Sequence, residues 1–208
     1  MKNLIELNVI YSLDREVNRV KSTVKKLSWY KERGYLNIAL PKNISEQSSL
    51  EDIFKATSSE YLETEYEKFS QRIKERWFEF INRIKMLHEI PSFHLRDKYN
   101  IVLTKYGTGG SYYPQTDKVI VNIKTKGQEE VMGTIIHEIV HIGIDHLIES
   151  HNVKHWYKER LVDLIMQRYF SELDKMQQIE KGANIVDEAF KKYFPDIEAI
   201  TREVGNIK

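Results

Sequence analysis

The sequence predicts an α+β fold with one buried helix and additional N- and C-terminal helices. Short apolar runs rich in β-branched residues occur between long runs of helical periodicity. One helical run, residues 128–150, is apolar over much of its circumference, which is typical of a buried helix. Because 41% of the 208 residues are hydrophobic, the chain can bury a sizeable core.

The start of the chain predicts a strand, a helix and a second strand. Residues 5–11 and 35–41 are short, apolar and partly β-branched, so we expect a strand in each. Between them apolar side chains recur at helical spacing. Ser12 is a favourable cap for the start of this helix, and Gly34 is a favourable stop.

The rest of the N-terminal region, which we place at residues 1–95, predicts one dominant helix. Residues 42–58 are rich in serine, and we expect a surface connection with about one turn of helix. Apolar residues then step by three and four along one face of residues 59–89, which predicts a long amphipathic helix. Pro91 ends it.

Two further strands are predicted in the middle of the chain, at residues 100–104 and 118–123. The connection at 107–117 is too long for a tight hairpin turn. Its glycines, Gly109 and Gly110, indicate either a simple turn or a loop or irregular edge strand that lets the backbone approach another group closely.

The apolar helix at 128–150 is followed by a second helix at about 155–175, and with the two strands they form the predicted core, residues 96–175. Residues 176–208 predict two more helical pieces. We expect all three regions to form one compact domain.

The apolar helix carries the most informative residues of the chain. His137 and His141 are four residues apart, so their rings share one helix face and can bind one metal ion, with Glu138 beside them. The chain has no cysteine, so any metal must be held by His, Asp or Glu. A catalytic zinc takes three protein ligands, and a third ligand must therefore come from elsewhere.

The second helix offers two carboxylates for this purpose. Glu159 and Asp163 are one turn apart and share a face, so one can bind the metal while the other supports a metal-bound histidine. Other residues remain alternatives for the third ligand, although a ligand further along the first helix would lie about 6 Å up its axis. These alternatives are Asp145, His146, His151 and His155.

The segment His137-Glu138-Ile139-Val140-His141, followed by Glu159 and Asp163, resembles the gluzincin group of zinc metallopeptidases, the thermolysin-like clan. The resemblance covers about residues 100–170. It implies a zincin-like fold, in which a small mixed β-sheet packs on the buried active-site helix, and a Zn²⁺ cofactor. It implies that His137, His141 and Glu159 are the metal ligands, that Glu138 is the general base, and that Asp163 supports His137.

Two departures from known patterns matter. Ile144 stands where the related metzincins have a glycine, which rules out the metzincin arrangement. Lys158 replaces the asparagine that often precedes the third ligand in thermolysin-like enzymes, and no histidine after Tyr169 offers a transition-state donor. These departures favour a divergent or minimal member of the group.

The resemblance implies a zinc-dependent hydrolase of peptide bonds. Zinc lowers the pKa of bound water to about 7, and Glu138 would accept the water's proton and pass it to the leaving amine. Two alternatives remain, a zinc-dependent hydrolase of another amide or ester and a non-catalytic binding or regulatory protein with structural zinc. Candidate contacts to the transition state or substrate are Tyr112, Tyr113, Tyr157, Gly109, Gly110 and His155.

Composition bears on partners and location. Lys and Arg number 32 against 31 Asp and Glu, and the two signs are interleaved, so we expect no nucleic-acid partner. We see no signal peptide and no run of about 20 apolar residues, and we therefore expect no membrane partner and a cytoplasmic location. The expected partner is a peptide or protein substrate. The oligomeric state is not predicted.

Overall fold

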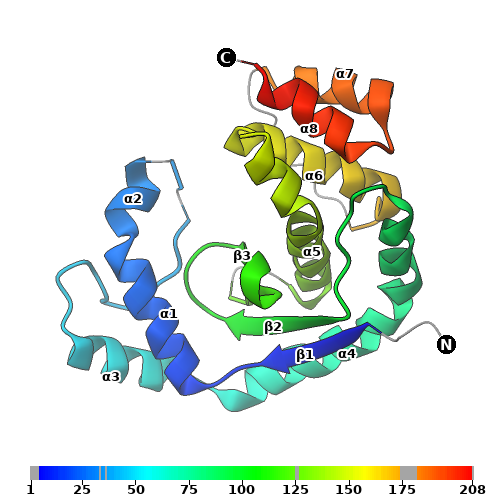
Figure 1. Cartoon of the computed structure of the whole chain (residues 1–208). Helices are drawn as coiled ribbons and strands as arrows, with labels where there is room; N and C mark the ends of the chain where they lie inside the picture. Colours follow the sequence, from blue (N-terminus) through cyan, green and yellow to red (C-terminus); the bar gives the residue numbers. More distant parts are fainter. Residues whose placement is uncertain (1–4, 33, 36, 125–126, 174–181, 208) are drawn as a thin grey trace.

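The computed structural model describes residues 5–32, 34–35, 37–124, 127–173 and 182–207. Its centre is a four-stranded sheet with the strand order β1-β2-β4-β3 (Figure 1). The β1–β2 and β2–β4 pairs are parallel, and the β3–β4 pair is antiparallel, so the predicted α+β class and mixed sheet are confirmed. The strands are β1 (Glu6–Ile10), β2 (Lys98–Thr104), β3 (Gly110–Tyr113) and β4 (Lys118–Asn122).

Eight α-helices accompany the sheet in the described part of the chain. Helix α5 packs against β3, β4, α4, α6 and α8, and is thus the element that most others contact. The helices are α1 (Leu13–Lys25), α2 (Leu27–Glu32), α3 (Leu50–Glu60), α4 (Glu63–Met86), α5 (Gln128–Ser150), α6 (His155–Tyr169), α7 (Asn184–Tyr193) and α8 (Ile197–Gly205). Short 3₁₀ turns occur at Leu87–Glu89 and Pro114–Thr116.

The core forms where the sheet meets α5. The central strands β2 and β4 contribute side chains that are almost fully buried, and α5 is buried around most of its circumference, as its sequence predicted. Because these side chains are buried, α5 cannot rotate about its own axis. The direction in which His137 and His141 point is therefore fixed. The buried side chains of α5 include Val131, Ile135, Ile136, Ile139, Val140 and Ile142.

Helix α5 is also long and apolar enough to cross a membrane by length and composition alone, contrary to our expectation from the sequence. Its apolar window is 72% buried within the fold. Such burial is that of a core helix.

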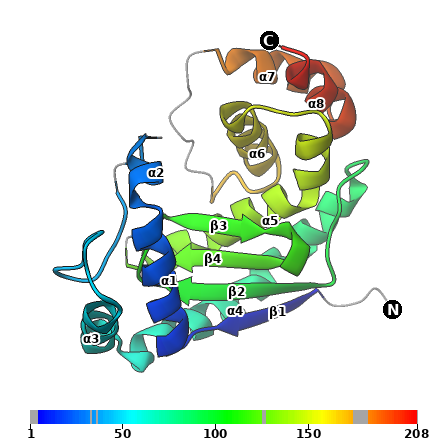
Figure 2. The same ribbon diagram turned by 60° about the vertical axis from the view of Figure 1, so that its left-hand side comes forward.

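Helix α1 crosses the end of the sheet at which the parallel strands β1 and β2 finish (Figure 2). The buried carboxylate of Glu16 on α1 holds it there by accepting hydrogen bonds from Thr104 Oγ1 (2.5 Å), the Lys105 backbone N–H (2.7 Å) and the Tyr66 hydroxyl. Hydrogen bonds to a buried carboxylate are strong and directional. The N-terminal helices are thereby fixed against the sheet, beside the loop that leads to β3.

The predicted strand at 35–41 is wrong for the described residues of that segment. Only Ala39 forms a β-bridge, with Gly107, and Leu36 lies outside the described residues. The parallel neighbour of β1 is β2, with Val9 opposite Ile101. Parallel pairing joins segments that are distant in sequence, so the apolar runs alone did not reveal the partner.

The predicted connection at 42–58 contains more helix than expected. Helix α3 has 11 residues and begins with a capping box, in which Ser49 and Asp52 bond each other's backbone N–H groups at 3.1 Å. The long helix predicted for 59–89 is present as α4 and its terminal 3₁₀ turn, but its first residues belong to α3.

The C-terminal helices are present as predicted, as α7 and α8 packed on each other and on α6 and α5. The helix expected at 155–175 is shorter than predicted, because α6 ends at Tyr169 with Phe170 as its C-cap. Residues 174 and 175 of that prediction lie outside the described residues.

Candidate metal centre

The two histidines of α5 face the same cavity, one helical turn apart. Their Nε2 atoms lie 3.0 Å from each other, and both rings are largely buried. The helical spacing of four residues places one ring above the other, and the buried apolar neighbours of each histidine prevent α5 from rotating them away.

Helix α6 brings Glu159 to the same point. Its Oε2 atom lies 3.2 Å from Nε2 of His141 and 3.4 Å from Nε2 of His137. One ligand atom from each of the three residues lies within 4.8 Å of the others, and this is the group with metal-ligand geometry within the described ranges. Two imidazole nitrogens and one carboxylate oxygen form a donor set that fits zinc.

The ionisation states of His141 and Glu159 favour cation binding. Burial lowers the pKa of His141 to about 3, so the ring is neutral near pH 7 and its nitrogen lone pair is free to bind a metal. Burial alone would raise the pKa of Glu159, but His141, His137 and Lys158 together lower it, so the carboxylate stays ionised. A neutral imidazole and an ionised carboxylate are the forms that metals require.

His137 differs from His141 because more carboxylates surround it. Burial would lower its pKa, but Glu159, Glu138 and Asp163 outweigh burial and raise it. Asp163, one turn after Glu159 on α6, has its Oδ1 atom 3.8 Å from Nδ1 of His137, the ring nitrogen that faces away from Glu159. This separation exceeds a hydrogen bond, but the carboxylate stands on the side from which it can orient the ring.

Glu138 follows His137 on α5 and is almost buried where β3 crosses the helix. A Cβ atom on Gly110 of β3 would lie 2.2 Å from Glu138 Oε1, so a larger residue at this position would displace the carboxylate or the strand. The prediction that the 107–117 glycines permit close backbone approach is confirmed at Gly110.

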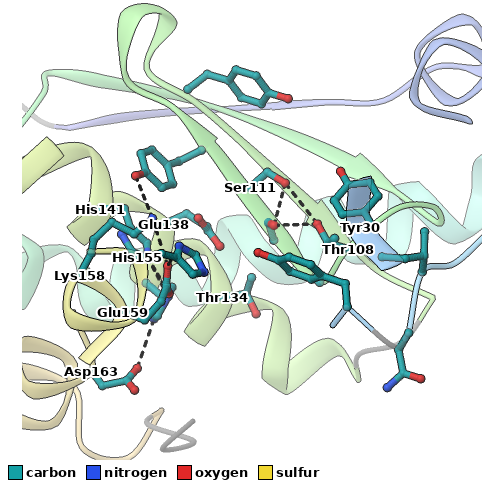
Figure 3. Close-up of a pocket in the computed structure, with 18 of the residues that line it drawn as sticks. Tyr30, Thr108, Ser111, Thr134, Glu138, His141, His155, Lys158, Glu159 and Asp163 are labelled. Carbon is teal, nitrogen blue, oxygen red and sulfur yellow. Dashed lines mark hydrogen bonds and ion pairs between the residues drawn. The ribbon is translucent and has the colours of Figure 1, made fainter. Parts of the chain in front are cut away.

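A cavity of about 1310 Å³ contains the whole group. Figure 3 shows His141, Glu138, Glu159, Lys158 and Asp163 around one end of it, and Tyr30, Thr108 and Ser111 towards the other. The cavity thus runs from His137, His141 and Glu159 along β3 to the N-terminal helices α1 and α2.

The residues predicted to contact the substrate or transition state differ in how they lie relative to the cavity. Tyr112 stacks on the His141 ring, with the ring centroids 4.7 Å apart and the planes 6° apart. Gly109, Gly110 and Tyr113 line the cavity, although the Tyr113 ring packs against the ammonium of Lys118 at 4.1 Å.

The last two predicted contacts lie on α6. His155 lines the cavity, with its Nδ1 atom 3.7 Å from Glu159 Oε1. Tyr157 does not belong to the lining and packs against the hydrophobic core beneath Lys154.

The alternative third ligands do not join the three-residue group within the described structure. His146 instead stacks on His94, with centroids 3.7 Å apart. His155 approaches the outer oxygen of Glu159 and not the oxygen that faces the two motif histidines. Asp145 and His151 are likewise outside the group.

Two features of the cavity were not identified as functional from the sequence. The first is Lys158, which contacts both Glu159 and Tyr112. It stands where thermolysin-like enzymes often have an asparagine, and this difference was the sequence signal that could have identified it. Aromatic side chains of the N-terminal region form the far wall, and no pattern in the sequence connected them to the motif helix. These are Trp29, Tyr30 and Tyr35.

No protein-family model, curated protein or solved structure matches this chain.

Proposed function

We propose that this protein is a zinc-dependent metallopeptidase with a zincin-like fold. The observation that carries the proposal is the convergence of His137, His141 and Glu159 within one cavity, with Glu138 directly beside them. Three ligands from two helices leave space on the cavity side for reactants, which is typical of catalytic zinc sites and not of closed structural ones.

Zinc held by these residues would polarise the scissile carbonyl and activate water as the nucleophile. In this proposal Glu138 would accept the proton of that water and return it to the nitrogen of the leaving amine. Its carboxylate is buried against β3, so bulk water does not compete strongly for it. Asp163 and the packing of α5 keep the two imidazoles in position during the reaction.

The shape of the cavity supports a peptide as substrate. β3 is an edge strand, since it pairs with β4 on one side and lies at the end of the strand order. Its residues line the cavity over the stretch from Gly110 to Tyr113. An extended peptide can pair with such an edge through main-chain hydrogen bonds, which would carry its scissile bond past Glu138.

The test is hydrolysis of a mixed peptide library by the zinc-loaded protein, with products identified by mass spectrometry. We expect cleavage by the wild-type protein and none above background by Glu138→Gln, although both bind zinc. A panel of esters and non-peptide amides serves as the comparison. Cleavage confined to that panel, or equal peptide cleavage by Glu138→Gln, would contradict the proposal.

A further inference from the structure

The ammonium group of Lys158 lies between the metal-binding group and the edge strand. Its Nζ atom is 3.1 Å from Glu159 Oε1 and 3.3 Å from the hydroxyl of Tyr112 (Figure 3). The side chain is only 13% exposed, and it lines the cavity. A lysine this enclosed is held by its partners and is not a solvated surface charge.

The two oxygens of Glu159 therefore have different partners. Oε2 faces the two histidines, at 3.2 Å from His141 and 3.4 Å from His137, whereas Oε1 faces Lys158. A protonated lysine has three donors and no acceptor, so it cannot itself bind a metal ion. The Glu159 carboxylate would therefore interact both with Lys158 and with any cation bound by the two histidines.

We propose that Lys158 is an internal counter-ion for Glu159 that weakens and tunes the cation site. Without metal, it balances a carboxylate that is otherwise buried among neutral or partly charged groups, and so stabilises the empty site. With metal bound, its positive charge repels the cation and draws electron density from the ligand carboxylate. The cation is then held less tightly and is more electrophilic than the same three ligands alone would make it.

This inference rests on the proposed metal site. It predicts that removing Lys158 changes the metal affinity in the opposite direction from that expected for a purely structural role. If Lys158 only held Glu159 in place, removing it would weaken metal binding. As a counter-ion it competes with the metal for Glu159, because its removal takes away the ammonium at Oε1 and leaves more of the carboxylate's negative charge to interact with the metal. Removal must then strengthen metal binding.

The experiment measures zinc affinity by competition with a chromophoric chelator, on the full chain after metal removal. Lys158→Met keeps the length of the side chain and removes its charge, and we expect zinc to bind at least tenfold more tightly. Lys158→Arg retains the charge and is expected to stay within about threefold of wild type. The matched control is Lys154→Met, an exposed lysine four residues earlier that lies outside the cavity lining.

Lys158→Gln provides a second neutral variant in case the methionine variant does not fold, and the same tightening is expected. Thermal unfolding adds an independent readout, because metal-free Lys158→Gln should melt below the metal-free wild type and gain more from added zinc. Unchanged or weaker zinc binding in the neutral variants overturns the role of Lys158. Absence of zinc binding by the wild type instead overturns the metal site itself.

Discussion

A Cβ atom on Gly110 would lie 2.2 Å from Oε1 of Glu138 and 2.8 Å from Cγ2 of Thr134. At Gly110 any larger residue would therefore require the Glu138 or Thr134 side chain, or the strand itself, to move. This contact places the proposed general base directly against the strand along which we expect the substrate to lie.

Replacing Gly110 by alanine should reduce peptide hydrolysis by at least about tenfold, because the new methyl group displaces Glu138 or the strand. Zinc should still bind, since neither Gly110 nor Glu138 is a proposed ligand. Turnover and zinc content measured on the same sample test this. Gly127→Ala is the matched control, because no atom lies within 4 Å of its added Cβ. Wild-type turnover in Gly110→Ala would show that the close contact is unimportant.

Asp163→Asn should lower zinc affinity by about 10- to 100-fold, because the variant removes the negative charge behind His137 while keeping the side-chain size. The measurement is chelator competition at pH 8. We expect the fold to be retained, as judged by circular dichroism. Equal affinity in the variant and the wild type would mean that Asp163 does not support the metal-binding ring.

The metal-free protein should lose stability on acidification because of His141. Burial lowers the folded-state pKa of His141 from 6.5 to about 3, so between these values the unfolded chain binds a proton that the folded chain does not. The stability contributed by neutral His141 is thus present above pH 6.5 and declines as the pH falls. Between pH 7 and pH 5 the decline amounts to about 2 kcal/mol.

Urea unfolding of wild type and His141→Gln at the two pH values, in a chelator, measures this difference. Glutamine does not titrate, so the variant should lack the decline. His137 acts in the opposite direction, because its pKa is raised, but it is present in both proteins. An identical pH dependence of the two proteins would contradict the neutral state of His141.

Trp29→Ala should raise the KM for peptide substrates about fivefold while changing kcat less than twofold. The Trp29 side chain is 44% exposed, stacks on Tyr35 and lines the end of the cavity formed by the N-terminal helices. Removing the indole ring should weaken substrate binding without changing the rate of the chemical step. Phe54→Ala, an exposed aromatic on α3 outside the cavity lining, is the control. A change in kcat alone would assign Trp29 a different role.

The convergence of His137, His141 and Glu159 was the feature of the molecule best predicted from the sequence. Residues four apart on a helix share a face whatever the rest of the fold does, so the positions of His137 and His141 followed from local geometry. The spacing of Glu159 and Asp163 likewise identified one face of α6. That this face meets the histidines depended on how α6 packs, for which the resemblance offered the expectation and the structure supplies the distances.

Features that depend on contacts between distant segments were not predicted. The choice of β2 as the neighbour of β1, and the position of Trp29 across the cavity from α5, require packing that no local pattern encodes. Helix α3 is different, because Ser49 and Asp52 have the spacing of a capping box and could have been recognised from the sequence. Lys158 was noticed only as a departure from a family pattern.

The most direct test of the account is a calorimetric titration of zinc into the metal-free wild-type protein and into Glu159→Gln. We predict one zinc ion per wild-type chain, and in Glu159→Gln a loss of affinity of at least about 100-fold, because the variant removes the only negatively charged ligand. Glu188→Gln, an exposed carboxylate paired with Lys191, should bind like wild type. Absence of zinc binding by the wild type, or undiminished binding by Glu159→Gln, would contradict the proposed centre.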